Sequence, residues 1–167
     1  MYESRHEESF LIRPMREGEE PDVCALVCRV FDEHVAPLYP PEGITEFKHY
    51  VTPDHITARA DNDHYVLLVF TQQELVGVIE MRRCEHVSLF FVETRYQSQG
   101  VGRRLMNKAI AVCRSQQRDI GSISVNSSLN AQSVYERLGF VAMEPIQTVH
   151  GISFVPMRLD LDDPRPR

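Results

Sequence analysis

Hydrophobic and polar positions divide the centre of the chain into a strand, a turn and a helix. Residues alternate in character from His86 to Val92, which predicts a strand with Val87, Leu89 and Phe91 on one face and the intervening residues on the other. A polar turn that contains two glycines follows this strand. Beyond the turn, apolar residues recur at helical spacing, which predicts an amphipathic helix.

The same two periodicities predict the rest of the secondary structure. Strands are expected at 10–15, 65–70, 75–82, 120–126 and in a closing hairpin within 142–160 that turns at His150–Gly151. Helices are expected at 18–34, at 44–60 with an interruption at Pro53, and over about ten residues that end at Leu138, with a stiff loop at 37–43. Ser127 and Ser128 are expected to cap the N-terminus of the last helix, and Gly139 to follow its end.

Composition and charge limit the class of protein. With 167 residues, 43% hydrophobic and 25% charged, the chain fits one globular domain, whose core is expected at about 10–161. The formal charge of −6 argues against nucleic acid or an anionic membrane as a partner, since both need a broad basic surface. The acidic N-terminus is unlike a secretory signal, and no apolar run approaches the roughly 20 residues that span a bilayer. A cytoplasmic protein is therefore expected.

Cysteine and histidine spacing gives no sign of a metal site. Cys24, Cys28, Cys84 and Cys113 form no C-x-x-C pair, and the seven histidines lack the spacing of zinc ligands. Reduced cysteines packed in the interior are expected, and no metal is expected.

The glycine-containing turn suits a phosphate group. Gly100 and Gly102 let backbone N–H groups approach a ligand without an intervening Cβ atom, and the helix start adds unpaired donors and a partial positive charge. Arg103 and Arg104 lie in the first helical turn, where cations are disfavoured; a bound anion would remove this conflict, although on charge alone exposure to water is the simpler explanation. No P-loop run exists, and Leu105 stands where a dinucleotide motif needs its third glycine.

Two motifs in the correct order resemble one protein family. The run Gln97-x-x-Gly100-x-Gly102 resembles the acyl-CoA pyrophosphate loop, [QR]-x-x-G-x-[GA], of the GCN5-related N-acetyltransferase (GNAT) superfamily. The run N-A-Q-S-V-Y-E-R-L-G-F, from Asn130 to Phe140, resembles the N-x-x-A-x-x-x-Y/L-x-x-x-G-F motif of the same family. The resemblance covers about residues 10–161, and the expected order of strands and helices agrees with it.

The resemblance implies both a fold and a cosubstrate. The fold would be α/β (α+β) of the GNAT type, with a mixed, mostly antiparallel sheet of about six to seven strands flanked by about four helices. Acetyl-CoA would lie in a gap between the splayed strands 86–92 and 120–126, where the Val92 N–H can polarise the thioester carbonyl. The residues assigned to acetyl-CoA are Phe90, Phe91, Val92, Gln97, Ser98, Gln99, Gly100, Val101, Gly102, Arg103 and Asn130. The loop reads Q-S-Q-G-V-G where many members have R-G-x-G-x-G, so weaker binding, not its loss, is expected.

Tyr135 is the expected general acid. A phenol with a reference pKa near 10 stays protonated at pH 7 and can donate a proton to a departing thiolate, whose reference pKa is about 8.5. The resemblance implies that this tyrosine lies beside the sulfur of CoA. The alternative is that Tyr135 only packs with Val134 and Leu138 in an ordinary helix.

The general base is left open between His86, Glu80 and a water molecule. His86 precedes Val92 by a spacing similar to that of a catalytic histidine or glutamate in other members of the family, and its reference pKa near 6.5 suits the role. Glu80 ends an otherwise apolar strand, where the pKa of a carboxylate can be raised. A solvated strand end explains either residue, and an ordered water can act instead.

The acceptor is expected at residues 31–60 and 143–155, where the resemblance places its site. Acidic and aromatic side chains there suit a cationic amine, and a solvated helix face explains the acids as well. These side chains are Asp32, Glu33, Tyr39, Glu42, Glu46, Phe47 and Tyr50. A non-catalytic acyl-CoA-binding module would keep the glycine turn without needing Tyr135, and an interaction domain that has lost CoA binding would not keep the turn. The resemblance also implies that a homodimer can form through the C-terminal strands.

Overall fold

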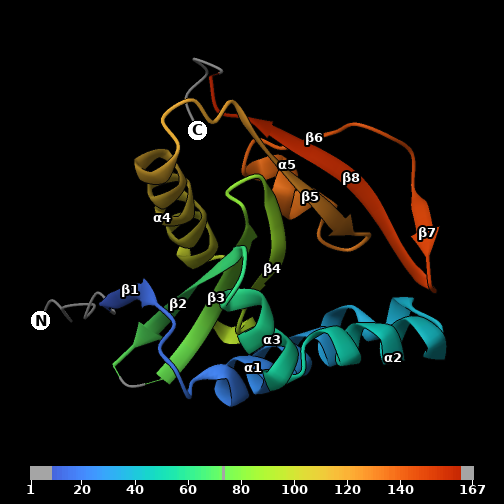
Figure 1. The fold of residues 1–167 in the computed structure, drawn as a ribbon. Helices are drawn as coiled ribbons and strands as arrows, with labels where there is room; N and C mark the ends of the chain where they lie inside the picture. The colour runs from blue at the N-terminus through green and yellow to red at the C-terminus, as the bar shows by residue number, and fades with distance from the viewer. Residues whose placement is uncertain (1–8, 73, 163–167) are drawn as a thin grey trace, which may run out of the picture.

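A twisted sheet runs through the molecule (Figure 1). The computed structural model describes residues 9–72 and 74–162. Within these residues eight strands pair in the order β1-β2-β3-β4-β5-β8-β6, and β7 also pairs with β8. All pairs are antiparallel except β4 with β5, which is parallel. The strands are β1 (Phe10–Pro14), β2 (His64–Thr71), β3 (Glu74–Arg82), β4 (His86–Val92), β5 (Ser122–Ser128), β6 (Val141–Ala142), β7 (Gln147–Val149) and β8 (Ile152–Asp160).

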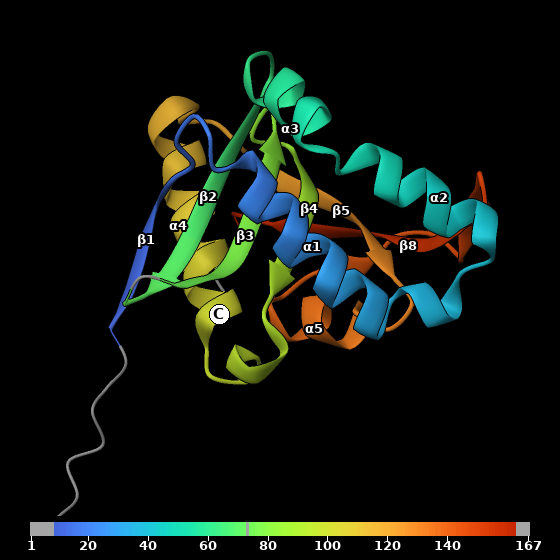
Figure 2. The same ribbon diagram turned by 90° about the horizontal axis from the view of Figure 1, so that it is seen from below.

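Helices cover both faces of the sheet (Figures 1 and 2). One core joins the sheet to the side chains of α4 and α5, and a second core joins it to those of α1 and α3. We call these two sides of the sheet the α4 face and the α1 face. The helices are α1 (Glu20–His34), α2 (Pro41–Tyr50), α3 (Pro53–Ala60), α4 (Val101–Gln116) and α5 (Gln132–Arg137), with short 3-10 turns η1 (Ala36–Leu38) and η2 (Thr94–Tyr96).

The expected fold class is confirmed, and most elements lie within a few residues of their predicted bounds. The structure contains more strands and helices than the expected six to seven strands and four helices, for two reasons. Pro53 ends the helical run as predicted and starts a separate helix, and the closing segment contains the short β6 as well as the hairpin. The hairpin turns at His150 and Gly151, both with positive φ, as a tight two-residue connection requires.

Two local predictions are wrong. Ser127 and Ser128 do not cap the last helix: they belong to β5, and α5 begins only at Gln132. Pairing of β5 with β8 continues as far as Ser128 opposite Phe154, so long-range sheet formation outweighs the local capping preference. The expected loop at 37–43 is also too long, because α2 already begins at Pro41 and proline is well tolerated in the first turn of a helix.

The C-terminal hairpin is held against the start of α2. Gly43 and Gly151 meet backbone to backbone, and a Cβ atom on Gly43 would come within 2.3 Å of the Gly151 carbonyl oxygen, so no side chain fits there. The Tyr39 hydroxyl donates to the Ser153 carbonyl oxygen at 3.1 Å. These contacts hold the hairpin against the start of α2.

Candidate functional site

β4 and β5 pair over two positions and then diverge (Figure 1). His86 lies opposite Ser124 and Val87 opposite Val125, and no later residue of β4 pairs with β5. The cause lies on the other edge of β4, which pairs with β3. Glu80 of β3 is opposite Leu89, but the next residue, Met81, is opposite Val87. Ser88 therefore has no partner on β3 and forms a bulge. A bulge bends its strand and increases the local twist, so β4 turns away from β5 just beyond it.

This divergence leaves backbone groups of β4 without a strand partner. The Glu93 N–H bonds to the Val76 carbonyl oxygen of β3 at 2.8 Å. Because successive N–H groups of a strand point to opposite edges, those of Val92 and Phe90 point away from β3 and toward the gap. The Val92 and Phe90 N–H groups can therefore pair with an extended ligand in the gap.

The bulge also reverses the faces predicted for β4. Val87 belongs to the core on the α4 face, together with Phe90 and Val92, whereas Leu89 and Phe91 pack on the α1 face. The predicted common face of Val87, Leu89 and Phe91 is therefore wrong. An extra residue shifts the alternation by one position, and local periodicity cannot reveal it.

The turn after β4 ends at the open N-terminus of α4. Gly100 has φ +80°, and a Cβ atom at this position would have nothing within 4 Å, so backbone conformation alone favours glycine there. Ser98 also has a positive φ, of 61°. The first N–H of α4 with a helical acceptor is that of Arg104, bonded to the Gly100 carbonyl oxygen. The preceding donors at the helix start have no acceptor among the described residues, which is the arrangement that binds phosphate.

Side chains of the turn hold its backbone in place. Gln97 Nε2 donates to the Val92 carbonyl oxygen at 2.9 Å, and Gln99 Nε2 donates to the Arg95 carbonyl oxygen at 2.7 Å. The position of Gly102 is set by packing, because a Cβ atom there would lie 3.2 Å from Phe90 Cζ. Helix and strand thus approach closely beside the gap.

The arginines that follow the turn have protein partners. Arg103 donates to the Arg137 carbonyl oxygen at the end of α5, at 2.7 Å. The Arg104 guanidinium lies 5.7 Å from the centre of the Phe10 ring. Both side chains remain exposed, so neither is removed from reach of an anion.

Tyr135 lies in α5 on the α4 face, next to the gap. Its ring is only 7% exposed and packs against Phe90 and Phe140, with centroids 5.9 and 5.3 Å away. Among the residues that the structure describes, its hydroxyl has no hydrogen-bond partner, and burial raises the pKa of this phenol. Asn130 is exposed in the turn between β5 and α5. A protonated donor therefore stands at the edge of the gap.

His86 is half-buried on the α1 face. Its Nδ1 atom lies 2.8 Å from Ser124 Oγ. Burial is the main cause that lowers the pKa of His86 to about 4, and the nearby Arg82 and His64 lower it further. The imidazole is therefore neutral at pH 7, and one of its two ring nitrogens is unprotonated.

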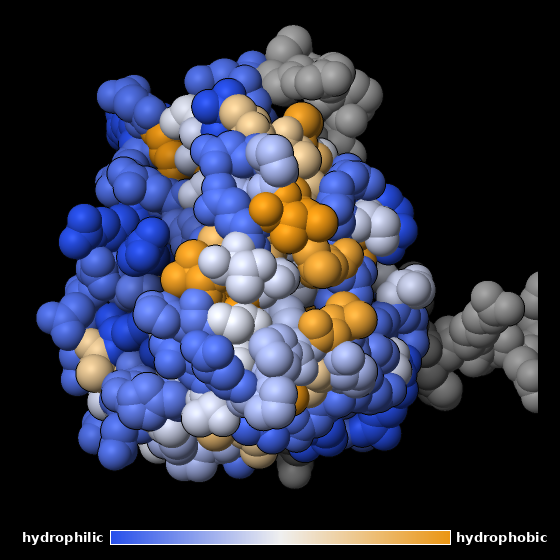
Figure 3. Space-filling model, turned by 90° about the vertical axis from the view of Figure 1, so that its right-hand side faces the viewer, coloured by the Kyte–Doolittle hydropathy of each residue, from blue (hydrophilic) through white to orange (hydrophobic). Residues whose placement is uncertain are grey.

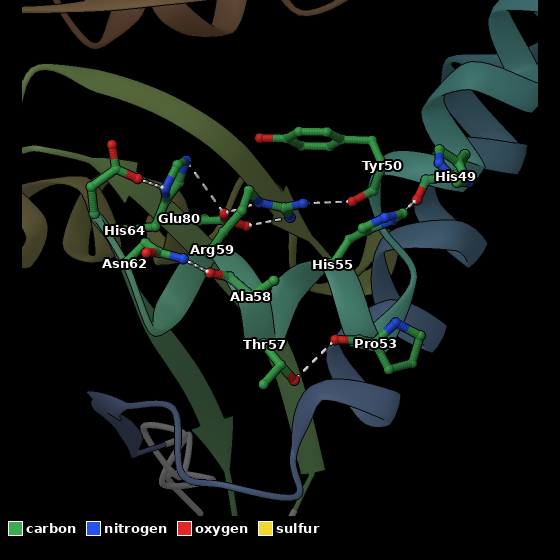
Figure 4. A network of polar contacts seen from close by, with 11 residues as sticks. His49, Tyr50, Pro53, His55, Thr57, Ala58, Arg59, Asn62, His64 and Glu80 are labelled. Atoms are coloured by element: carbon green, nitrogen blue, oxygen red, sulfur yellow. Dashed lines mark hydrogen bonds and ion pairs between the residues drawn. The ribbon is translucent and has the colours of Figure 1, made fainter.

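Glu80 is fully buried on the α1 face and is held by Arg59 of α3 (Figure 4). Arg59 Nε and Nη2 donate to its two carboxylate oxygens at 2.6 and 3.0 Å, and His64 Nε2 lies 3.7 Å from it. The Arg59 guanidinium also stacks 3.8 Å from the centre of the Tyr50 ring. Both oxygens are thus occupied, which leaves this carboxylate badly placed to take a proton from a substrate.

A cavity of about 850 Å³ lies on the outer side of this network. Glu46, His49 and Tyr50 of α2 line it, together with Arg59 and Asp61 of the α3 region. Burial raises the pKa of the Tyr50 phenol, and the Ser88 hydroxyl of the bulge is one of the nearby groups that lower it. Tyr50 and Arg59 therefore form the wall between the cavity and the bulge of β4.

Other side chains expected around the acceptor are already engaged. Asp32 pairs with Lys48 at 2.8 Å, and Glu33 accepts from Thr94 at 2.8 Å. Phe47 stacks on Phe31, with centroids 4.0 Å apart. Tyr39 bonds to the hairpin as described above, and Glu42 is exposed at the start of α2. Of the expected group, Glu46 and Tyr50 alone line the cavity.

Sequence reasoning missed Ser88, Ser124 and Arg59. A buried carboxylate is stable only with a cation beside it, so a carboxylate within an apolar strand indicates a buried cation. Glu80 is such a carboxylate. The sequence does not say which cation pairs with it, because Arg59 lies 21 positions away. Nothing in the local pattern marks Ser88 or Ser124.

Clustered metal ligands and membrane-spanning helices are both absent from the described residues. Residues 9–72 and 74–162 contain no group of three or more His, Cys, Asp or Glu side chains arranged to hold a metal ion. All four cysteines are unpaired, and Cys84 and Cys113 are buried. No helix in the described part of the chain is long and apolar enough to cross a membrane.

Known proteins share this architecture. A family model described as "Acetyltransferase (GNAT) domain" matches residues 35–161. A search of curated proteins finds no match. The fold is similar to that of a GCN5-related N-acetyltransferase from Rhodopseudomonas palustris, with TM-score 0.78, 19% identity, and coverage of 90% of this chain and 95% of that one.

Two further solved structures share the fold. PaiA N-acetyltransferase from Thermoplasma acidophilum, in complex with coenzyme A, has TM-score 0.75 at 16% identity and covers 91% of this chain and 99% of its own. The ribosomal-protein-S18-alanine N-acetyltransferase from Escherichia coli has TM-score 0.66 at 17% identity and covers 92% of this chain and 94% of its own.

Proposed function

Since this chain belongs to the GNAT acetyltransferase family and is an acetyl-CoA-dependent N-acetyltransferase, we propose that it transfers the acetyl group by direct attack to a primary amine of a small molecule or peptide. The observation that carries this proposal is the divergence of β4 from β5 beside the open N-terminus of α4. One extended ligand can pair with the strand edge and place its phosphates at the helix. We propose that the chain forms one such domain, with its core at about 10–161.

Acetyl-CoA is proposed to lie along the edge of β4 and across the following turn. The backbone of Phe90, Phe91 and Val92 would hold the pantetheine arm, with the Val92 N–H polarising the thioester carbonyl. Asn130, exposed beside the gap, would bond to the same arm. The segment Gln97–Arg103 would hold the pyrophosphate through its backbone donors.

The reaction needs a base for the amine and an acid for the thiolate. Tyr135 is proposed as the acid, because its hydroxyl is protonated and has no hydrogen-bond partner among residues 9–72 and 74–162. His86 is proposed as the base in preference to Glu80, whose carboxylate is occupied by Arg59. His86 lies on the α1 face, so the amine would approach from that side of the sheet. The cavity beside Tyr50 is lined by Glu46 and Asp61 but also by Arg59 and Arg83, so its charge does not by itself select a cationic amine.

Substitution of Gly100 tests the acetyl-CoA site. Gly100→Arg is expected to weaken acetyl-CoA binding at least about tenfold, since its side chain would enter the space in front of the donors of α4. Gly18→Arg is the matched control, because Gly18 also has positive φ and open space around it but lies far from the gap in the turn before α1. Calorimetric titration with acetyl-CoA measures both variants.

Turnover then separates two functions. Thiol release from acetyl-CoA with a panel of primary amines is expected for the wild-type protein. Binding without release for any amine would favour a non-catalytic acyl-CoA-binding module. Equal binding by the Gly100→Arg and Gly18→Arg variants would contradict the proposed phosphate site.

We also propose a homodimer through the C-terminal strands. Large apolar side chains are exposed there, namely Val141 (58%), Met143 (50%), Ile146 (61%) and Val149 (50%). Figure 3 shows hydrophobic surface among polar surface on the side of the molecule that carries β7. Such patches mark protein interfaces. Light scattering is expected to give a dimeric mass for the wild type and a monomeric mass for Ile146→Glu; a monomeric wild type would contradict this interface.

A further inference from the structure

His86 and Ser124 face each other where β4 and β5 still pair. They are opposite residues of the parallel ladder, and Ser124 Oγ lies 2.8 Å from His86 Nδ1. The next pair, Val87 and Val125, is buried in the core on the α4 face. Alternation therefore places the side chains of His86 and Ser124 on the α1 face, at the point from which the gap opens.

The hydroxyl proton of Ser124 has a backbone acceptor. Ser124 Oγ lies 3.1 Å from the Glu85 carbonyl oxygen and donates to it, while the Ser124 N–H bonds to the same oxygen at 2.8 Å. A carbonyl oxygen can only accept, and a serine hydroxyl has one proton to donate. With that proton used, Ser124 Oγ accepts the hydrogen bond from His86 Nδ1–H.

This hydrogen bond decides which ring nitrogen of His86 is basic. A neutral imidazole carries one proton, so with Nδ1 protonated the lone pair resides on Nε2. Among the described residues Nε2 has no hydrogen-bond partner. The charged groups that act on the ring are Arg82 of β3 and His64 of β2, and both disfavour a second proton on it. The ring is thus neutral, and the lone pair of Nε2 is free.

Resting on the proposed acetyl transfer, we propose that Ser124 is the positioning residue that holds His86 in the Nδ1–H tautomer, so that Nε2 can take the proton of the acceptor amine. The amine nitrogen bonds to the thioester carbonyl carbon, and its proton passes to Nε2 directly or through one water. The C–S bond breaks, and the sulfur takes the proton of Tyr135. His86 returns its proton through solvent to the Tyr135 phenolate, which restores the enzyme.

The tautomer itself is measurable without turnover. Long-range ¹H–¹⁵N correlation spectra of the ¹⁵N-histidine-labelled protein at pH 7 are expected to show His86 with a protonated Nδ1 and an unprotonated Nε2. The His86→Gln variant identifies these signals among the seven histidines. In Ser124→Ala the two nitrogens are expected to become averaged or reversed, because the free ring samples both tautomers. Ser122→Ala, on the same strand and face, is expected to leave them unchanged.

Kinetics connects the tautomer to catalysis. Ser124→Ala is expected to lower kcat about tenfold while the acetyl-CoA Kd stays within about twofold, and Ser124→Thr, which keeps the hydroxyl, is expected to retain kcat. Protonated Nε2 in the wild type, or unchanged spectra and kcat in Ser124→Ala, would overturn the role of Ser124. Failure of the wild type to acetylate any amine would instead overturn the proposed function, and the spectra would still decide the tautomer.

Discussion

Replacement of Tyr135 by phenylalanine is expected to lower kcat about 100-fold while acetyl-CoA affinity changes by less than about twofold. The hydroxyl has no partner among the described residues, so its removal breaks no hydrogen bond. The ring would keep its packing against Phe90 and Phe140. The variant therefore lacks the proton donor and little else. Thiol release and calorimetric titration measure the two quantities.

Tyr65 provides the matched control for this variant. Its hydroxyl donates to the Ala109 carbonyl oxygen at 2.8 Å, within the same core but away from the gap. Tyr65→Phe is expected to lower the free energy of unfolding by about 1 kcal/mol and to leave kcat unchanged. Full turnover by Tyr135→Phe would show that Tyr135 only packs in the core and that the thiolate leaves without its help.

Replacement of Arg59 by alanine is expected to lower the free energy of unfolding by about 3–5 kcal/mol. Glu80 is fully buried, and Arg59 supplies both hydrogen bonds to its carboxylate from a side chain that is itself 14% exposed. Without Arg59, a carboxylate remains in the interior, with His64 Nε2 3.7 Å from it. Denaturant unfolding measures the loss.

Two comparisons isolate the buried charge as the cause. Arg83→Ala removes a surface ion pair with Asp63, with Arg83 69% exposed, and is expected to cost no more than about 1 kcal/mol. Adding Glu80→Met to Arg59→Ala removes the unpaired charge and is expected to recover most of the lost stability. Equal losses in the single and double variants would show that packing of α3, and not charge, is responsible.

Much of the fold could be predicted from the sequence because the deciding patterns are local. Alternation located β4, and helical spacing gave α1, whose apolar stripe from Val23 to Phe31 is buried as expected. Gly139 ends the last helix in a left-handed conformation, with φ +97°. Pro53 separates two helices. In each case the residues that form the pattern lie in, or within a few positions of, the strand, helix or turn that they predict.

The sequence also contains the two motifs on which the proposed acetyl-CoA site rests, since glycines and a helix start are encoded in adjacent positions. It did not determine how β4 is placed against its neighbours. The bulge at Ser88 depends on registers with β3 and β5 together, and it decides which faces the side chains of β4 take.

Only the tertiary structure gives a reason to propose His86 and not Glu80 as the base. In the sequence, His86 and Glu80 are both polar residues at strand ends. In the fold, Arg59 from a helix 21 positions earlier bonds to Glu80, and Ser124 from a strand 38 positions later lies 2.8 Å from His86 Nδ1. The protonation of these two side chains and their free lone pairs depend on partners that only folding brings within hydrogen-bonding distance. For that reason, no local pattern of residues predicts which of the two side chains is free to act.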